Sequence, residues 1–330
     1  MTPVFRVLAD DEDVTKAIAD RLESLTVQDH AGTESDTATI VLDDSPPHIA
    51  RPRRGVRLSI ALGYDGDDQS GPVTLGQYVV DEVGLSGPAN RLTIKARAAD
   101  LRAGLKQGKT RVFDDVTLGD LVQTIAAEHG YTPAVGEFLA DIYFPHVHQV
   151  DESDLHLLTR LARQYGAVVK PAGGKLILAE QGATKSVSGQ ALPEVTLTPK
   201  DMGQWTVDEA DRAAYAAVEA HYHDVDAAER KTVTIGGGEP VYTIRGTKAD
   251  QATATQAARA KFDALERGAA TISLSDCPGN PGLLAEAPLI TTGARDGVNG
   301  RWVITSATHT YNKRSGYRCL VEAETSPEAV

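Results

Sequence analysis

The sequence GQYVVDEV at residues 76–83 has an echo near the C-terminus, GRWVITSA at residues 300–307. An apolar run and an Asp-Gly turn precede each stretch, and another alternating strand follows it. These flanking segments are Val56–Leu62, Asp65-Gly66 and Leu92–Ala96 in the first copy, and Pro288–Thr292, Asp296-Gly297 and Tyr317–Ala323 in the second. The sequence therefore predicts one strand–turn–strand–turn–strand unit that occurs twice, so three chains in a ring would present six similar surfaces.

The length and composition are those of a soluble globular protein with several domains. A chain of 330 residues usually forms two or three domains, and contents of 41% hydrophobic and 24% charged residues are ordinary for that class. No run approaches the ~20 apolar residues of a membrane helix. The N-terminal residues Met1–Arg6 lack the basic-then-apolar pattern of a signal peptide. We therefore expect that the chain does not insert into a membrane and that it assembles in the cytoplasm, where it is made.

The charge balance excludes one class of partner. A formal net charge of -13 argues against a dedicated DNA- or RNA-binding surface, which would need a basic stripe. The one tight basic cluster that we single out is Arg51, Arg53 and Arg54, beside Pro52. Such a cluster can contact an acidic partner, or it can simply belong to a solvated loop.

Residues 1–103 have the pattern of a small β-barrel or sandwich. Thr37–Leu42 and Val56–Leu62 alternate between apolar and polar residues, which indicates strands with one buried face. Short, even spacing with Gly and Asp turns is typical of such all-β units. Asp13–Leu22 is expected to form a short helix.

Residues 104–200 change to a mixed α/β pattern. A helix is predicted from the N-cap Thr117, with Asp120 at the third position, to a stop at Gly130. A second helix starts near Asp151 or Ser153 and ends at Gly166. A hairpin with its turn at Gly173-Gly174 follows it.

Residues 201–330 return to β structure. Strands alternate around Val218–His223, and a helix is predicted at about residues 250–267, with Gly268 at its C′ position. The second copy of the echoed unit completes this region.

The sequence shows no catalytic, cofactor-binding or metal-binding constellation. His146 and His148, and likewise His221 and His223, form H-x-H pairs that could place two rings on one strand face. Zinc catalysis requires three protein ligands with organised support, so exposed strand histidines are the simpler interpretation. Two cysteines, Cys277 and Cys319, are too few for a disulfide framework and are expected to be buried.

Thr117–Tyr131 is similar to the first helix of LysM peptidoglycan-binding modules, since it combines a polar cap, an Ile-Ala step and a Gly stop. Any amphipathic helix with these caps shares the pattern. Glycan binding and plain packing are therefore both open interpretations of this helix.

A broader resemblance covers nearly the whole chain. Residues 1–180 resemble the late control D proteins of contractile-tailed phages, which are baseplate hub proteins related to the N-terminal part of VgrG spike proteins of type VI secretion. The most specific stretch is Glu152–Ala167, and the last third matches more loosely through Arg267–Thr271 and Gly300–Val303. Other matching stretches are Asp13–Thr15 with Ile18 and Arg21-Leu22, Glu34–Thr37, Leu42–Asp44, Gly76–Val83, Ala98–Leu101, Leu105-Lys106 and Lys109–Arg111.

The resemblance implies a β-rich α+β fold, in which two related small β-barrel domains (residues 1–103 and 201–330) flank a mixed α/β middle domain (residues 104–200). It implies a homotrimeric, pseudo-sixfold ring in the baseplate of a phage tail or tail-like particle. The implied partners are the central spike and the tail-tube or tube-initiator protein, with the tape measure and baseplate wedge proteins as further candidates. Because the chain stops at Val330 without a long repeat, the spike is expected to be a separate protein.

This implied function is structural, and its joints are expected to be strand edges, because open edges invite association. We expect the strands that carry Tyr78, Val80, Trp302 and Ile304 to pair across subunit boundaries. DNA would pass through an acidic lumen without sequence-specific binding. The alternative function is a peptidoglycan-binding or cell-wall-degrading tail component, and another is a type VI or toxin-injection hub.

Overall fold

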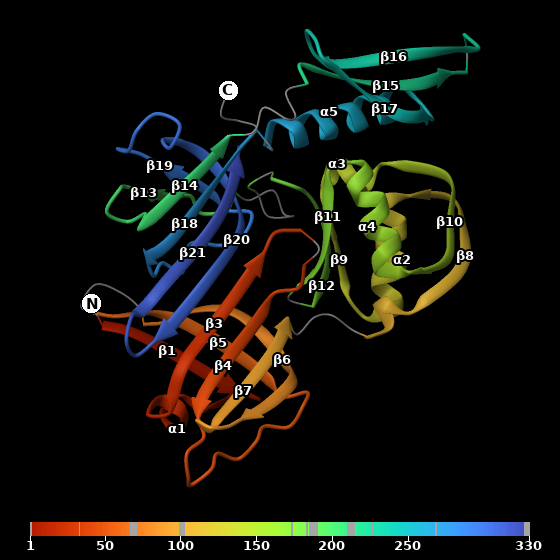
Figure 1. Ribbon diagram of the computed structural model, residues 1–330. Helices are drawn as coiled ribbons and strands as arrows, with labels where there is room; N and C mark the ends of the chain where they lie inside the picture. Colours follow the sequence, from red (N-terminus) through yellow and green to blue (C-terminus); the bar gives the residue numbers. More distant parts are fainter. Residues whose placement is uncertain are drawn as a thin grey trace.

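The computed structural model describes residues 2–326 except 33, 67–70, 99–102, 173, 183, 185–190, 210–214, 226 and 268. The predicted turn residue Gly173 and helix cap Gly268 therefore lie outside the described residues. Strands dominate, as the sequence predicts, and a few helices pack among them (Figure 1). None of the helices in the described part of the chain is long and apolar enough to span a membrane.

The first module is a curved antiparallel sheet with the order β3-β4-β7-β6-β5-β1-β2. The short helix α1 is smaller than expected, because the strand β3 already begins at Leu22. The bounds are β1 Thr2–Ala9, β2 Glu12–Asp13, α1 Thr15–Ala19, β3 Leu22–His30, β4 Thr37–Asp43, β5 Arg57–Asp65, β6 Val73–Ser86 and β7 Arg91–Ala98.

The second module repeats this arrangement with the order β14-β18-β21-β20-β19-β13. The strands are β13 Val195–Leu197, β14 Gln204–Glu209, β18 Ala270–Pro278, β19 Pro288–Thr291, β20 Gly300–Asn312 and β21 Gly316–Thr325. The strands β14, β18, β19, β20 and β21 correspond to β3, β4, β5, β6 and β7 of the first module in both neighbours and direction.

The correspondence extends to the register of individual residues. Each of the eight partner pairs between β6 and β7 has a counterpart between β20 and β21, and the register shifts at the same place, after Val80 and after Ile304. The backbone N–H groups of Gly55 and Glu286 donate equivalent 2.8 Å hydrogen bonds to the carbonyl oxygens of these two residues. Gly55 and Glu286 also share a left-handed backbone, with φ values of 88° and 66°. The echo in the sequence is thus a structural repeat.

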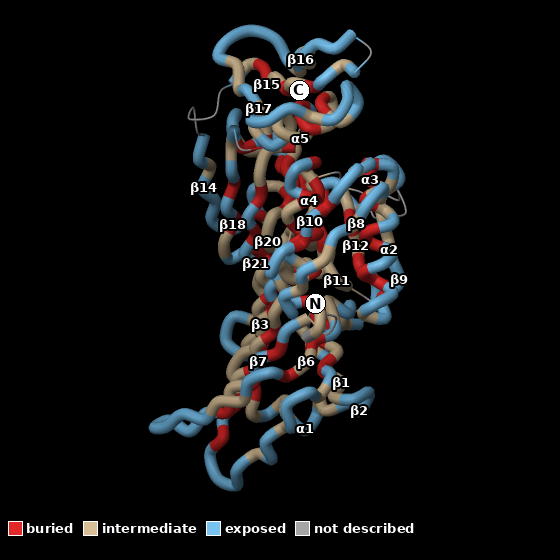
Figure 2. The backbone as a smooth tube through the Cα atoms, turned by 90° about the vertical axis from the view of Figure 1, so that its right-hand side faces the viewer, coloured by how far each residue is buried: buried red, intermediate tan, exposed pale blue. Residues whose placement is uncertain are grey.

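A seam joins the two modules into one continuous sheet. The strand β3 runs antiparallel to the second half of β20, from Leu25 opposite Tyr311 to His30 opposite Ser306. One hydrophobic core extends through both modules (Figure 2). The sequence predicts two related β units but gives no sign of this connection. The divisions at residues 103 and 200 stay predictions.

The second module carries an insertion that the first lacks. The strands β3 and β4 are joined by the short connection 31–36, whereas a separate unit lies between the corresponding strands β14 and β18. This unit is a three-stranded sheet, ordered β16-β15-β17, covered by α5. Its bounds are β15 Ala217–Asp224, β16 Glu229–Gly236, β17 Val241–Lys248 and α5 Gln251–Arg267, which confirms the predicted helix. In Figure 1 it projects from the second module, beyond the middle unit.

The middle unit has its own core between its helices and two small sheets. Its elements are η1 Ala103–Lys106, β8 Gly108–Thr117, α2 Leu118–His129, β9 Thr132–Val135, α3 Glu137–Ala140, β10 Tyr143–Ser153, α4 Asp154–Gln164, β11 Ala167–Ala172 and β12 Lys175–Glu180. The predicted cap of α2 is confirmed, because Thr117 and Asp120 form a reciprocal capping box. The second helix begins directly after Ser153, one of its two predicted starts, and the Ser153 side chain caps it. The hairpin β11–β12 packs toward the seam.

Candidate assembly interface

The four residues predicted to mark ring-interface strands lie in the core of the chain. Tyr78, Val80, Trp302 and Ile304 are at most 4% exposed. At these positions the strands are also internal. β6 has β5 or the preceding residues on one side and β7 on the other, and β20 lies between β21 and the strands β19 and β3. These side chains are therefore unavailable to a neighbouring chain in this structure. A ring interface stays a prediction, and its side-chain contacts must come from other residues.

A charged contact holds the middle unit against the seam. Lys170 of β11 donates to the carboxylate of Asp36 at 2.8 Å and to the backbone oxygen of His30 at 3.0 Å. The carboxylate of Asp29 lies 3.4 Å from the same ammonium and accepts a hydrogen bond from the backbone of Ala285. Burial raises the pKa of Asp36 despite the nearby ammonium. This contact ties β3, the middle unit and the second module together.

Two of the stretches that carry the family resemblance, Lys109–Arg111 and Glu152–Ala167, meet at Asp154 at the start of α4. Its buried carboxylate accepts hydrogen bonds from Lys109 at 2.6 Å, Arg111 at 2.7 Å and Gln149 at 2.8 Å, and His129 Nε2 lies 2.7 Å away. Burial alone would raise the pKa of Asp154, but the hydrogen bonds and the nearby guanidinium lower it to about 2. Asp154 therefore links β8, β10, α2 and α4.

The cluster around Asp154 also contains a group of side chains that could in principle bind a metal ion. Ligand atoms of Glu128, His129 and Asp154 lie within 4.8 Å of one another. However, Lys109 and Arg111 already donate to both carboxylates. A cation would have to displace two positive side chains, so the donor set fits an internal ion-pair cluster better than a metal centre.

The remaining candidates have ordinary structural roles. His146 pairs with Asp114 at 2.7 Å in the exposed part of β10, and His221 contacts the hydroxyl of Thr232. Cys277 and Cys319 are buried as expected. They face each other across β18 and β21 as free thiols, and burial raises the pKa of Cys277 to about 12 and that of Cys319 to about 11.

The helix that is similar to a LysM helix uses its apolar face for packing. The buried residues of α2 all belong to the core of the middle unit. They are Leu118, Leu121, Val122, Ile125 and Ala126. This arrangement supports the packing interpretation of the pattern.

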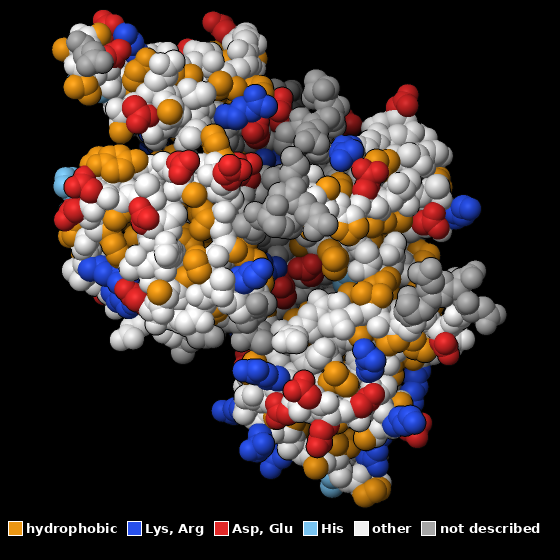
Figure 3. All heavy atoms as spheres, turned by 180° about the vertical axis from the view of Figure 1, so that it is seen from behind, with side chains coloured by type: hydrophobic (Ala, Val, Ile, Leu, Met, Phe, Trp, Pro, Cys, Tyr) orange, Lys and Arg blue, Asp and Glu red, His pale blue; other side chains and the backbone are white. Residues whose placement is uncertain are grey.

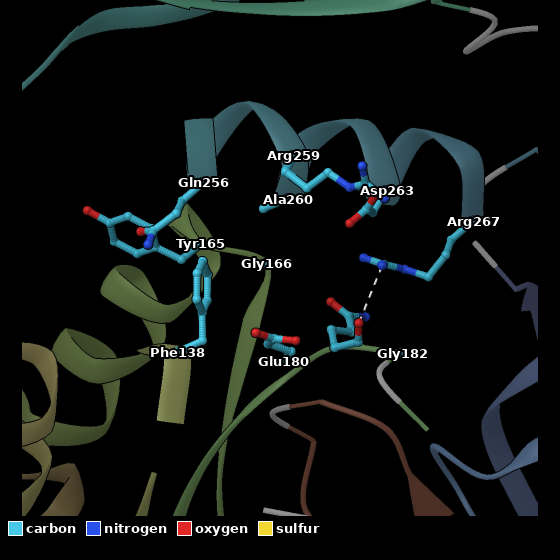
Figure 4. Close-up of a pocket in the computed structure, with 11 residues that line it drawn as sticks. Phe138, Tyr165, Gly166, Glu180, Gly182, Gln256, Arg259, Ala260, Asp263 and Arg267 are labelled. Atoms are coloured by element: carbon cyan, nitrogen blue, oxygen red, sulfur yellow. Dashed lines mark hydrogen bonds and ion pairs between the residues drawn. The ribbon is translucent and has the colours of Figure 1, made fainter. Parts of the chain in front are cut away.

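A hollow of about 280 Å³ lies between α5 and the middle unit (Figure 4). Phe138 and Tyr165 line it on the middle-unit side, while Arg259, Asp263 and Arg267 project from α5. Arg267 donates to the backbone oxygen of Gln181 at 3.3 Å, and Arg259 pairs with Asp263. The three charged side chains from α5 are thus engaged within the chain, and the hollow lies at a junction between two units.

Charged side chains of both signs are interspersed on the face of the first module shown in Figure 3. Such a mixed surface differs from the basic stripe that nucleic-acid binding requires.

Known proteins with similar sequences and folds identify the family. The model of the phage tail baseplate hub family matches residues 50–315. A probable baseplate hub protein of Escherichia phage 186 is 32% identical, over 98% of this chain and 93% of the relative. Among solved structures, a tail protein of prophage MuSo2 from Shewanella oneidensis has a TM-score of 0.70 at 12% identity, with all of both chains covered.

A further solved structure is the PdpA–VgrG complex of Francisella. It has a TM-score of 0.55 at 9% identity, over 98% of this chain and 58% of that chain. At such identities the solved structures support the fold, whereas the family model and the phage relative support the assignment itself. The chain belongs to the phage tail baseplate hub family, whose members are structural components of the virion.

Proposed function

We propose that the chain forms a homotrimer that joins the sixfold tail tube to the threefold central spike. The observation that carries this proposal is the in-register repeat of the five-stranded module. Three chains place six such modules around one axis, so one end can match a sixfold tube while the assembly keeps a threefold axis for the spike. Whether the particle is a phage or a headless relative makes no difference to this geometry.

The proposed partners follow from this position in the tail. They are the spike protein and the tail-tube or tube-initiator protein, with the tape measure and baseplate wedge proteins as further candidates. The structural neighbour from Francisella is a VgrG complex, which supports a spike as partner. The net charge of -13 suits a lumen through which DNA passes without adhering, because like charges repel.

The proposed role is structural rather than enzymatic. The Asp154 cluster is occupied by internal ion pairs, and the charged side chains that α5 directs at the hollow are engaged within the chain. This differs from an active site, where titratable groups face a cavity that a substrate can enter.

Co-purification tests the proposal. The tagged chain is expressed with the spike and tube proteins of the same particle, and the complex is weighed by light scattering and viewed by negative-stain microscopy. We expect three hub chains in a ring with an open centre, bound to the spike. A chain that binds neither protein and remains monomeric would refute the proposal. Retention on purified peptidoglycan with clearing of cell-wall suspensions would instead support the cell-wall function.

A further inference from the structure

The seam inside the chain shows how two modules join. One side of β20 is fully paired with β21. Its other side is shared, because β19 pairs with Gly300–Val303 and β3 pairs with Ser306–Tyr311. The edge strand of one module, β3, therefore pairs with the second half of a central strand, β20, in the next module.

The equivalent strands elsewhere in the chain are β6, which corresponds to β20, and β14, which corresponds to β3. Both have backbone without a neighbouring strand in the described residues. In the first module, β7 covers one side of β6, and β5 covers only Val73–Val79 on the other. The segment Glu82–Ser86 has no strand beside it there, within the described residues. The strand β14, which corresponds to β3, pairs only with β18 in the described part of the chain and forms the outer edge of the second module (Figure 1). Within the described residues, the two counterparts of the seam are thus an open strand edge, β14, and an open half-strand, Glu82–Ser86 of β6.

Side chains on the open strands β6 and β14 are more exposed than those at the matching positions of β20 and β3, which are paired with each other. Leu85 on β6 is 56% exposed, whereas His309 at the matching position of β20 is 0% exposed. Trp205 on β14 is 41% exposed, whereas Leu25 at the matching position of β3 is 0% exposed. At both open copies of the seam a large apolar side chain is therefore left in solvent at a position that is buried in the closed seam.

We propose that β14 of one chain pairs antiparallel with Glu82–Ser86 of β6 in a neighbouring copy of the same chain. This inference rests on the proposed trimer and specifies its joint. Transferring the register of the internal seam places Val207 opposite Leu85 and Glu209 opposite Val83. Three such joints alternate with three internal seams and close a ring of six modules. Strand addition supplies backbone hydrogen bonds, and the pair of Leu85 and Val207 supplies apolar contact.

Charge complementarity favours a second copy as the occupant. At the internal seam, the Asp29 carboxylate accepts a hydrogen bond from the backbone of Ala285. The register assigns Glu209 and Arg54 to the matching positions. The acidic end of β14 would therefore meet the exposed basic cluster Arg51–Arg54 of the neighbour. The joint gives that cluster an acidic partner.

Disulfide trapping tests the register directly. In the full chain, Leu85→Cys combined with Val207→Cys is oxidised and run on a non-reducing gel. We expect covalent dimers and trimers. Mixing the two single variants should give covalent dimers only, because each joint contains one residue from each chain. Leu85→Cys with Asp208→Cys is the matched control, since Asp208 lies on the opposite face of the strand and should not crosslink.

Charged substitutions test whether the joint holds the trimer. Leu85→Lys and Trp205→Lys should each reduce the mass in sedimentation from three chains to one, with an unchanged circular dichroism spectrum. Val73→Lys and Leu320→Lys, at sites 48% and 40% exposed, are the controls and should remain trimeric. Glu209→Arg should weaken the trimer, and Arg54→Glu in the same chain should restore it.

The outcomes separate this joint from the wider proposal. A trimer that survives both Leu85→Lys and Trp205→Lys and gives no trapped species overturns the joint, while the hub function stands. Protection of β14 by the spike or tube protein in place of a second copy also overturns it. A wild-type chain that is monomeric both alone and with the spike overturns the joint and the proposed trimer together.

Discussion

Replacing Asp154 by Asn should loosen the middle unit strongly. The substitution keeps the shape of the side chain but removes the buried charge that faces Lys109, Arg111 and His129. Removing one partner of a buried ion pair typically costs about 3–5 kcal/mol, because the other charges stay buried without compensation. Since about 1.4 kcal/mol is a factor of ten, local opening of α4 should become roughly 100- to 4,000-fold more frequent.

Hydrogen exchange with mass spectrometry measures this opening, because amides of α4 exchange when the unit opens locally. The matched control is Asp114→Asn, which removes an exposed charge beside His146 in the neighbouring sheet and should cost less than about 1 kcal/mol. Unchanged exchange of α4 in Asp154→Asn would refute the view that this cluster clamps the unit together.

The same carboxylate predicts a loss of stability in acid. Its pKa is about 2 in the folded chain, below the ordinary value of 3.8. The stabilisation is therefore complete above about pH 4 and is lost as the pH falls toward 2, in total about 2 kcal/mol. The test is to measure hydrogen exchange of α4 between pH 5 and pH 2.5 in the wild type and in Asp154→Asn, corrected for intrinsic exchange. If both proteins showed the same acid sensitivity, Asp154 would not be its source.

Three further substitutions test other parts of the structure. Gly55→Ala should cost about 1–2 kcal/mol through its left-handed backbone alone, because nothing lies within 4 Å of the added carbon; an unchanged thermal midpoint would contradict this. Burial lowers the pKa of His309, so the unfolded chain binds a proton more readily and wild-type stability should fall as the pH drops below 6.5. His309→Leu should remove this dependence in urea titrations, and an equal pH slope in both proteins would contradict this role of His309. Lys170→Met leaves the carboxylates of Asp29 and Asp36 without their cation and should cost about 1–3 kcal/mol; a thermal midpoint equal to that of the wild type would show that this clamp is dispensable.

Much of the fold can be predicted from the sequence, because the alternation of apolar and polar residues along a strand indicates which of its faces is buried. The alternation around Val80 and Ile304 identifies two buried strands and their repeat, and the structure confirms the repeat residue by residue. The caps at Thr117 and Ser153 fix the starts of two helices, since side-chain capping is local chemistry. The seam between β3 and β20 was not predictable, because strand pairing at long range leaves no local pattern.

The candidate interface shows the limit of the same reasoning. Period-two alternation marks the face of a strand that is buried, but it does not show which strand has a free edge. Strands with the clearest alternation are central ones, so Tyr78 and Trp302 lie in the core. The signals that could have located the open edges are weaker: an apolar Leu85 beyond the bulge of β6, and Trp205 in an otherwise polar strand. Only comparison of the two modules in space makes these signals interpretable.

A cryo-electron microscopy map of the assembled wild-type chain would show directly how the modules join. We expect a threefold ring in which six modules follow one another around the axis, with every second junction formed by β14 against the second half of β6. A ring whose chains meet through other surfaces, with β14 in solvent, would contradict this expectation.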